Sequence, residues 1–300
     1  MKEPVRHHYI PQFLLRQFCE ETGVLHYYDK EKNVISNKKP EEVFVVRNLY
    51  RDELNNPDNP AKIEKDFARF ENEASKIIYK FLEDDTIYLS FEEEEKLRLF
   101  LALMGFRSDR TKDYFKNTKS DTFKDFYIKY QDDENFDDLW KRNLGLIVNC
   151  RSCKEVVDHK DIDEPFKIFI MRDTHGIPFD SYFMILERRG KADFLLSDSY
   201  PAISEGSSDK GLKLELYSFY PISPSRALLR VHFGADATPK SILGFDQNFF
   251  KEPRKQRDKN VRIFNVQNTY EDDVRRLNSL AFETASYGVI SNKANIKELL

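Results

Sequence analysis

The sequence predicts an α+β protein, with a helical first half packed on an antiparallel β-sheet from the second half and a closing C-terminal helix. Apolar residues recur at helical spacing over residues 61–83 and again over 269–286. From residue 166 onward, short runs of β-branched and aromatic residues alternate with turns rich in Gly, Ser and Pro. We expect a single domain, 1–300, with a mainly helical half at 1–160 and a mainly β half at 161–300.

The helical half begins with a short helix near Pro11, since proline suits the first position of a helix. Two apolar stretches, 24–28 and 34–36, flank a polar turn and predict a β-hairpin. The run 43–50 fits either a strand or a buried turn. Further helices are expected at 61–83, after Ser90 with Glu93 completing a capping box, at 121–130 and at 136–157.

In the β half, strand composition marks the stretches 166–171, 193–197, 212–219 and 227–233. An antiparallel sheet is the economical arrangement, because short turns separate these strands. The stretch 179–187 fits either a strand or a helix. Residues 249–262 are basic and are expected to form a surface loop, and 269–286 is the closing helix.

The composition excludes several classes of protein. Hydrophobic residues make up 40% of the chain, and the formal net charge of −4 argues against a general nucleic-acid-binding coat. No apolar run approaches the roughly 20 residues that a membrane span needs, and the N-terminus lacks the apolar segment of a secretory signal. Cys19, Cys150 and Cys153 make no disulfide framework, so we expect a reducing, cytoplasmic location.

Two adjacent histidines, His7 and His8, stand just ahead of the helix that begins near Pro11. The positive end of a helix dipole attracts anions and disfavours a charged imidazole. A neutral imidazole acts as a base, an electrophile or a metal ligand. Adjacent side chains diverge in an extended segment, so only one ring is expected to face a given pocket. The alternative is that both rings lock the N-terminus by hydrogen bonds to the backbone.

These histidines open a longer pattern, HHYxPxFxLRxF, formed by His7, His8, Tyr9, Pro11, Phe13, Leu15, Arg16 and Phe18. Further motifs accompany it: Asn48–Tyr50, Glu64 and Glu71 before Ala74, Arg107, Phe194–Asp198, Pro221–Pro224 and Asn278–Ala285. With these motifs the chain resembles, over nearly its whole length, a bacterial family known only as domain of unknown function 4238. The resemblance implies a bacterial, cytoplasmic protein and no established activity.

The candidate catalytic residues are His7, His8, Tyr9, Arg47, Arg107 and Asp198. The candidate substrate-binding residues are Arg16, Ser197, Lys251, Arg254, Lys255 and Arg257. Arginine suits bidentate binding of phosphate, polar residues at strand ends often line sites, and a basic cluster after two phenylalanines suits a nucleic-acid backbone. The alternatives are ion pairs of the arginines with Glu64, Glu71 or Asp198, contacts of Arg16 within its own helix, a turn cap, and a solvated loop.

Carboxylates on one helix are compatible with a divalent metal. Glu64 and Glu71 lie two turns apart on one face, and with Glu94 or Asp198 they could hold such an ion. A solvated face, or arginine partners for the glutamates, is the favoured alternative. No residue is assigned to a metal, and no cofactor is expected with certainty.

Cys150 and Cys153 have the CxxC spacing of many zinc and redox sites. A zinc site needs about four ligands, and His159 still leaves this set one short. A redox dithiol would need a preceding strand, whereas the tract is predicted to be helical. We therefore expect neither function here.

We expect a phosphodiester-cleaving enzyme, a nuclease with RNA favoured, in which a histidine near Asp198 and Arg107 transfers protons and arginines stabilise the developing charge. RNA is favoured because its own 2′-OH can be the nucleophile. The resemblance suggests a toxin or phage-defence effector. The alternatives are a non-catalytic module that binds an anionic ligand or protein partner, and a motif that only fixes the N-terminus. Nucleic acid is the expected partner, a membrane is not, and a protein partner encoded nearby or a homo-oligomer is compatible with the sequence.

Overall fold

A computed structural model describes most of the chain. The described residues are 5–108, 136–167, 170, 181–207, 213–232, 245, 249, 254–256 and 261–300. The chain divides into two compact units, each assembled from three separate stretches. Unit 1 comprises Met1–Ile10, Phe44–Lys76 and Glu92–Gly176. Unit 2 comprises Pro11–Val43, Ile77–Phe91 and Ile177–Leu300.

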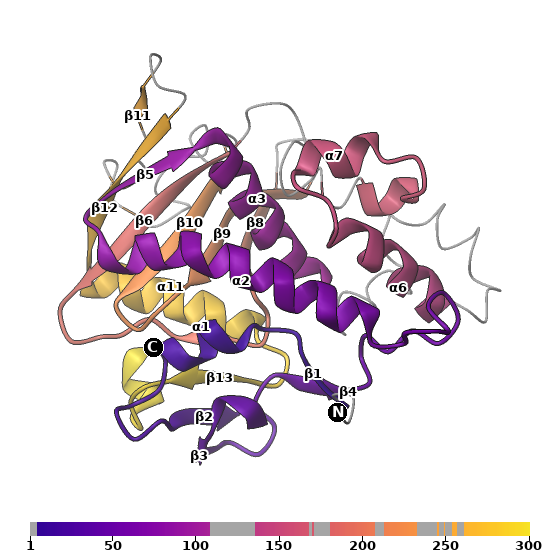
Figure 1. Ribbon diagram of the computed structural model, residues 1–300. Coiled ribbons are helices and arrows are strands. Elements are labelled where there is room, and N and C mark those ends of the chain that lie inside the picture. Colours follow the sequence, from indigo (N-terminus) through magenta and orange to yellow (C-terminus); the bar gives the residue numbers. More distant parts are fainter. Residues whose placement is uncertain are drawn as a thin grey trace. The chain divides into compact units, whose positions relative to one another are not determined.

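Unit 1 consists of helices and a two-stranded sheet (Figure 1). Strands β1 (Arg6–His8) and β4 (Val45–Arg47) pair antiparallel. The helices are α2 (Lys62–Glu83), α3 (Phe91–Phe106), α6 (Phe136–Ile147) and α7 (Cys153–Asp158), of which α2 and α3 cross the boundary between the units. Aromatic rings fill the centre, where the centroid of Tyr50 lies 5.0 Å from that of Phe67 and 6.1 Å from that of Trp140.

The two long helices form for different reasons. In α2 the apolar residues make one stripe, so one side of the helix is buried and the other is charged. Helix α3 is buried on all sides along Leu97–Met104. Its buried Glu94 pairs with Arg98 one turn later, Oε1 to Nη2 at 2.8 Å, because a charge removed from water needs a partner.

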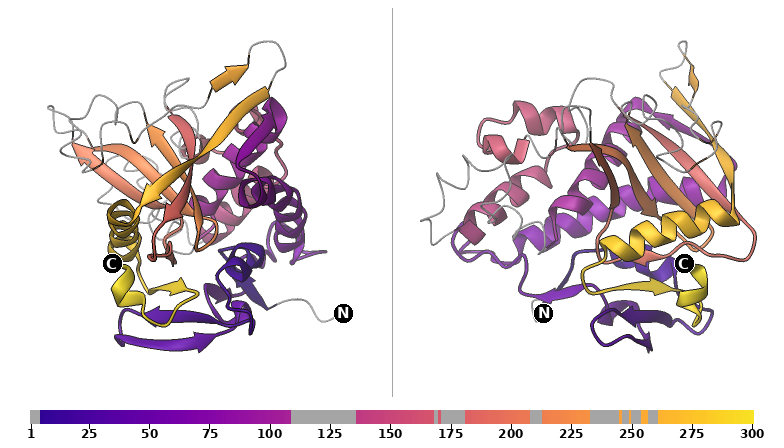
Figure 2. Two further views of the ribbon diagram at one scale, coloured as in Figure 1. Left: turned by 90° about the vertical axis from the view of Figure 1, so that its left-hand side faces the viewer. Right: turned by 180° about the vertical axis from the view of Figure 1, so that it is seen from behind.

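Unit 2 contains a seven-stranded sheet in the order β11-β12-β6-β10-β9-β8, with β5 also pairing β12. Its strands are β5 (Thr86–Ser90), β6 (Ser181–Arg189), β8 (Ala202–Ser207), β9 (Lys213–Pro221), β10 (Arg226–His232), β11 (Arg254–Gln256) and β12 (Val261–Tyr270). Strand β12 runs parallel to β6, and the other pairs are antiparallel. Helix α11 (Glu271–Thr284) lies along one face of this sheet (Figure 2), and its Val274, Leu277 and Ala281 join the core cluster that contains Leu229 of β10.

A second sheet in unit 2 joins the two ends of the chain, in the order β3-β2-β13-β7. Its strands are β2 (Leu25–Asp29), β3 (Val34–Lys38), β7 (Leu196–Ser197) and β13 (Gly288–Ser291). Only glycine fits at the start of β13, because a Cβ on Gly288 would lie 2.2 Å from the backbone oxygen of Tyr28. The helices α1 (Gln12–Gln17), η1 (Pro40–Glu42) and η2 (Ile296–Leu299) complete the unit.

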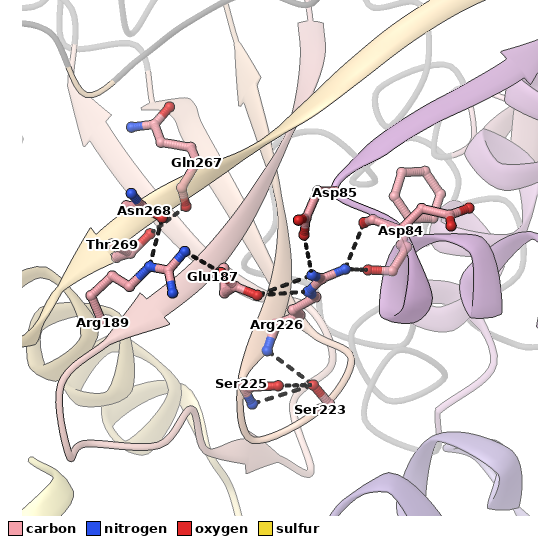
Figure 3. A network of polar contacts seen from close by, with 11 residues as sticks. Asp84, Asp85, Glu187, Arg189, Ser223, Ser225, Arg226, Gln267, Asn268 and Thr269 are labelled. Carbon is pink, nitrogen blue, oxygen red and sulfur yellow. Dashed lines mark hydrogen bonds and ion pairs between the residues drawn. The ribbon is translucent and has the colours of Figure 1, made fainter.

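Arg226 of β10 binds the C-terminal end of α2 (Figure 3). Its Nη1 donates to the carbonyl oxygens of Phe81 at 3.0 Å and Asp84 at 2.7 Å. Its Nη2 pairs with Asp85 Oδ1 at 2.8 Å and Glu187 Oε1 at 3.0 Å. A helix leaves its last carbonyls without donors, and the negative end of its dipole attracts a cation. Arg226 is therefore a structural residue that fixes the end of α2 to strands β6 and β10.

The α+β class is confirmed, and so are several predicted elements: the hairpin β2–β3, helix α2, strands β9 and β10, and the closing helix α11. The undecided stretch 179–187 is part of strand β6 from Ser181 onward, where the described residues resume, and the run 43–50 contains β4. The strand predicted at 193–197 is confirmed only for the two residues of β7. The helix predicted at 121–130 lies outside the described residues.

Four structural predictions are wrong. Residues 164–167 are helical, whereas a strand was expected at 166–171. The helix expected at 136–157 is two helices, because Ser152 caps α7 by accepting a hydrogen bond from Glu155 N. The basic stretch 249–262 includes β11 and the start of β12. The sheet is mixed, because β12 runs parallel to β6.

None of the described helices has the length and apolar character to span a membrane.

Candidate functional site

The β1–β4 sheet decides which way the two histidines point. Arg6 lies opposite Arg47, His7 opposite Val46 and His8 opposite Val45. Side chains alternate along a strand, and directly opposed residues share a face. Arg6, His8 and Arg47 therefore lie on one face, which we call the outer face of the β1–β4 sheet. On this face both arginines are exposed and His8 is partly exposed, whereas His7 points the other way and is only 1% exposed.

Strand β4 lies between two residues in the left-handed backbone region, Phe44 at φ 51° and Asn48 at φ 55°. Asparagine tolerates this region, but a bulky residue such as phenylalanine is strained there by about 1 kcal/mol or more. The ring of Phe44 is buried, with its centroid 6.0 Å from that of Tyr9. Two sharp bends thus confine β4 to three residues and place Arg47 at its exposed end.

His7 is a structural residue of the core. Its Nδ1 accepts a hydrogen bond from the backbone N–H of Tyr50 at 2.8 Å, and the two rings stack with 5.5 Å between centroids. Because Nδ1 is an acceptor, it carries no proton, and the proton of this neutral imidazole is on Nε2. A ring that is buried and engaged in this way holds the N-terminal strand against the residues that follow β4.

Arg107, just past the end of α3, is buried and donates to three groups. Its Nε donates to the hydroxyl of Tyr50 at 3.0 Å, Nη1 to Glu71 Oε1 at 2.5 Å, and Nη2 to the backbone oxygen of His8 at 2.6 Å. Its guanidinium lies over the ring of Phe67, 3.9 Å from the centroid. This is the ion pair with Glu71 that the sequence offered as the alternative. Arg107 positions His8 by binding the backbone carbonyl of His8. Arg107 itself is only 1% exposed and is therefore out of reach of a ligand.

Glu64 is a titratable group for which the sequence offered a metal ligand, a solvated residue or an ion-pair partner. Its Oε2 is buried and, within the part of the chain that the structure describes, accepts no hydrogen bond. Burial raises its pKa from 4.5 to about 7; nearby Arg107 lowers it and Glu71 raises it further. The signal in the sequence was its place beside the apolar stripe of α2, between the buried Ile63 and Phe67.

The candidates at the end of β7 belong to unit 2, and both have structural partners there. Asp198 accepts hydrogen bonds from the backbone N–H of Ser286 at 2.9 Å and of Tyr287 at 2.8 Å, which fixes the turn between α11 and β13. This matches the turn-cap alternative. The buried Ser197 donates its hydroxyl to the backbone oxygen of Ser199 at 2.7 Å.

Arg16 is exposed and donates to Gln12 Oε1 of its own helix at 2.8 Å, as the local alternative predicts. Arg254 and Lys255 lie in β11, opposite Ile263 and Arg262 of β12, while Lys251 and Arg257 lie outside the described residues. Unit 1 thus contains His7, His8, Tyr9, Arg47 and Arg107, and unit 2 contains Arg16, Ser197 and Asp198. The convergence of a histidine with Asp198 stays a prediction.

The sequence raises two further kinds of site, a divalent metal and the Cys150–Cys153 pair. No group of three or more His, Cys, Asp and Glu residues suited to a metal occurs in the described part of the chain. Cys150 and Cys153 are buried, and burial raises the pKa of Cys150 to about 12. A thiol with such a pKa is protonated at neutral pH and is therefore a poor nucleophile or redox group.

A comparison with protein families finds one model, described as protein of unknown function (DUF4238), that matches residues 6–295. Neither the curated proteins nor the solved structures give a match. The matched residues include the β1–β4 sheet, Glu64, Glu71 and Arg107, so the geometry described above lies within the family's own sequence pattern.

Proposed function

The chain belongs to the DUF4238 family, whose description carries no activity, and we propose a function from the geometry of unit 1. We propose that the protein is a phosphodiester-cleaving enzyme, a nuclease with RNA as the favoured substrate, whose site is the outer face of the β1–β4 sheet. The observation that supports this most is that Arg6, Arg47 and the partly exposed His8 share this face.

The two arginines are placed at a cost that an anion would relieve. Arg6 and Arg47 are directly opposite each other, and like charges in that relation destabilise a sheet. A phosphate between them would remove this repulsion, and each guanidinium offers a planar pair of N–H donors that fits phosphate oxygens. The repulsion without a ligand, and its relief with one, favour an anionic substrate.

In the proposed reaction, the neutral ring of His8 accepts the proton of a ribose 2′-OH. The 2′-oxygen forms a bond to the neighbouring phosphorus, and the bond from phosphorus to the 5′-oxygen breaks. The leaving oxygen takes a proton from the imidazolium or from water, so the charges balance. Arg6 and Arg47 would stabilise the extra negative charge that the phosphoryl group carries in the transition state.

The buried network behind the sheet would position this site. Arg107 holds the carbonyl of His8, and His7 receives the N–H of Tyr50, so β1 is fixed at two successive residues. A catalytic ring must be held to within a fraction of an ångström, and rigid support from a buried layer provides that. Arg107 is thus a positioning residue in this proposal and does not touch the substrate.

The test compares RNA and single-stranded DNA as substrates, each with Mg²⁺ and with EDTA. We expect wild type to cleave RNA in both conditions, His8→Ala to lose cleavage, and Arg6→Gln and Arg47→Gln to raise KM. Arg151→Gln, an exposed arginine elsewhere in unit 1, is the matched control and should cleave normally. If wild type cuts neither polymer under any of these conditions, the nuclease proposal is wrong.

The proposed setting is the bacterial cytoplasm, where the three cysteines would stay reduced, and the proposed role is a toxin or phage-defence effector. Expression of wild type in a bacterial host should then slow growth and degrade cellular RNA, whereas His8→Ala should do neither. Normal growth at a high level of folded wild type would contradict this role without excluding cleavage in the test tube.

A second candidate is a binding module without chemistry, and the burial of His7 favours it. One of the two rings is structural, so the motif leaves only a single imidazole for proton transfer. Such a module would bind RNA or another polyanion through Arg6 and Arg47 and would leave it intact. Binding that falls with rising salt, without cleavage, and unchanged in His8→Ala would select this function.

A further inference from the structure

A second region of unit 1 is hollow and is separate in its residues from the β1–β4 sheet. The hollow has a volume of about 400 Å³ and lies among the loop before α2, the first turn of α2, helix α6 and the end of α7. This volume is within the range of small-molecule sites, about 300 to 1,000 Å³. Ile63 and Leu146 contribute apolar side chains to its lining, and Gly145 in the same lining carries no side chain that would fill the space.

The polar side chains around the hollow are held by aspartates that are not part of its lining. Asp52 accepts hydrogen bonds from the amides of Asn55 at 3.0 Å and Asn56 at 2.7 Å. Asp66 accepts from Lys62 Nζ at 2.5 Å. A polar side chain that is bound by a residue outside the lining is oriented before a ligand arrives. The loop and the first turn of α2 therefore present fixed polar groups to the space.

Helix α6 and the turn that follows it contribute in the same way. Arg142 Nη2 donates to Asp163 Oδ2 at 2.5 Å, and Asn149 Nδ2 donates to Asp66 Oδ2 at 2.9 Å. An arginine has five N–H donors and a lysine three, so the cations that line the hollow keep donors beyond those that bind the aspartates. A ligand therefore meets charged donors that are already held in place.

The remaining lining adds a further donor and one acidic group. His159 accepts the N–H of Asp161 on Nδ1 at 3.2 Å, so when neutral it carries its proton on Nε2. Glu155, the one carboxylate among the described lining residues, already accepts the backbone N–H of Arg151 at 2.7 Å. Lys62 and Arg142 outnumber this carboxylate within the lining, and each is also paired with an aspartate outside it. The N–H donors that these cations and His159 keep favour an acceptor-rich ligand.

We propose that this hollow binds a nucleoside monophosphate. The phosphate would contact Lys62 and Arg142, which suit it as a point charge and as a planar fork of donors. The base would lie against Ile63 and Leu146, and the carboxamide of Asn56 would contact its polar edge. The proposal does not rest on nuclease activity, because it concerns different residues and a binding event alone.

The direct test is calorimetric titration of the full chain with 5′-AMP and 5′-UMP, and with inorganic phosphate and adenosine as the separate parts. We expect a nucleotide to bind with a Kd below about 1 mM, and each part to bind at least about tenfold more weakly. Absence of nucleotide binding to folded wild type would overturn the proposal. Phosphate binding as tightly as the nucleotide would overturn the assignment of the ligand class.

Variants locate the site. Arg142→Gln should weaken nucleotide binding about tenfold or more, because it removes a charged hydrogen bond to the phosphate. Gly145→Leu should abolish binding by filling the hollow; its Cβ would meet Ile63 Cγ1 at an ordinary 3.4 Å. Lys154→Gln is the control and should bind normally, because Lys154 neighbours Glu155 in α7 but its side chain is 77% exposed and outside the lining. Unchanged binding in a folded Gly145→Leu would place the nucleotide elsewhere and overturn the proposal.

Discussion

Tyr50 and Arg107 are joined by two hydrogen bonds that run in opposite directions. The hydroxyl of Tyr50 donates to the backbone oxygen of Arg107 at 2.9 Å and accepts from its Nε at 3.0 Å. The same tyrosine donates its backbone N–H to His7, and the same arginine pairs with Glu71. Four motifs that are far apart in the sequence therefore meet in one buried network.

Tyr50→Phe removes both hydrogen bonds and keeps the ring in place. The Nε of Arg107 would then be buried without a partner, so we expect the free energy of unfolding to fall by about 1 to 3 kcal/mol. Urea denaturation measures this change. Tyr270→Phe is the control, since that residue is 69% exposed and should change stability little. Equal stabilities of the two variants would contradict the role of the network.

His7→Phe separates the structural histidine from its neighbour. The substitution keeps ring stacking but leaves the N–H of Tyr50 without an acceptor, which should cost about 1 to 3 kcal/mol. His8→Phe should cost less, because the ring of His8 is only partly buried. Thermal melting of the two variants ranks their losses of stability. A larger loss in His8→Phe than in His7→Phe would contradict the structural role of His7.

Comparison with Glu64→Gln should reveal that ionisation of Glu64 lowers the free energy of unfolding of wild type as the pH rises. Its pKa of about 7 in the folded chain exceeds the ordinary 4.5, so the native state retains a proton that the unfolded state releases. The free energy of unfolding should therefore fall as pH rises from about 4.5 to 7, by about 3 kcal/mol in total. Glu64→Gln lacks this fall and should gain stability relative to wild type between pH 5 and pH 8. The exposed Glu83→Gln, on the same helix, should show a constant difference.

Arg226→Lys tests the link between α2 and the sheet that Figure 3 shows. A lysine keeps the charge but loses the planar fork that reaches Phe81, Asp84 and Glu187 together. We expect a loss of about 2 kcal/mol or more in urea denaturation. Arg189→Lys is the matched control, because Arg189 is 55% exposed by side chain; a loss as large there would refute the argument.

The long helices are predictable from the sequence because their burial pattern is local. Helix α2 repeats buried residues at helical spacing over 22 residues, and no strand produces that pattern. The hairpin β2–β3 is predictable for a similar reason, since a polar turn separates its two apolar runs. Strand β5 was missed although buried Ile87 and Leu89 flank the exposed Tyr88, because five residues between two strong helices give a weak signal.

Local sequence patterns do not predict which strands pair or which distant side chains bind each other, because tertiary packing decides both. Nothing within β12 indicates that it runs parallel to β6, because parallel and antiparallel neighbours require similar residues. Likewise, alternation along β1 predicts that His7 and His8 diverge, but it does not say which ring is buried. The pairing of Arg107 with Glu71, 36 positions away, appears in the sequence only as one of several alternatives.

The pairing of β2 with β13 has a consequence for synthesis of the chain on the ribosome. Strand β2 ends at Asp29, whereas its neighbour β13 begins at Gly288. At about 5 to 20 residues per second, the nascent hairpin waits roughly ten to fifty seconds for that neighbour. Throughout this interval the side of β2 that β13 will occupy presents unpaired backbone groups to other chains in the cell. A messenger RNA truncated before codon 288 would thus yield a polypeptide prone to aggregation, even though most of its helices are complete.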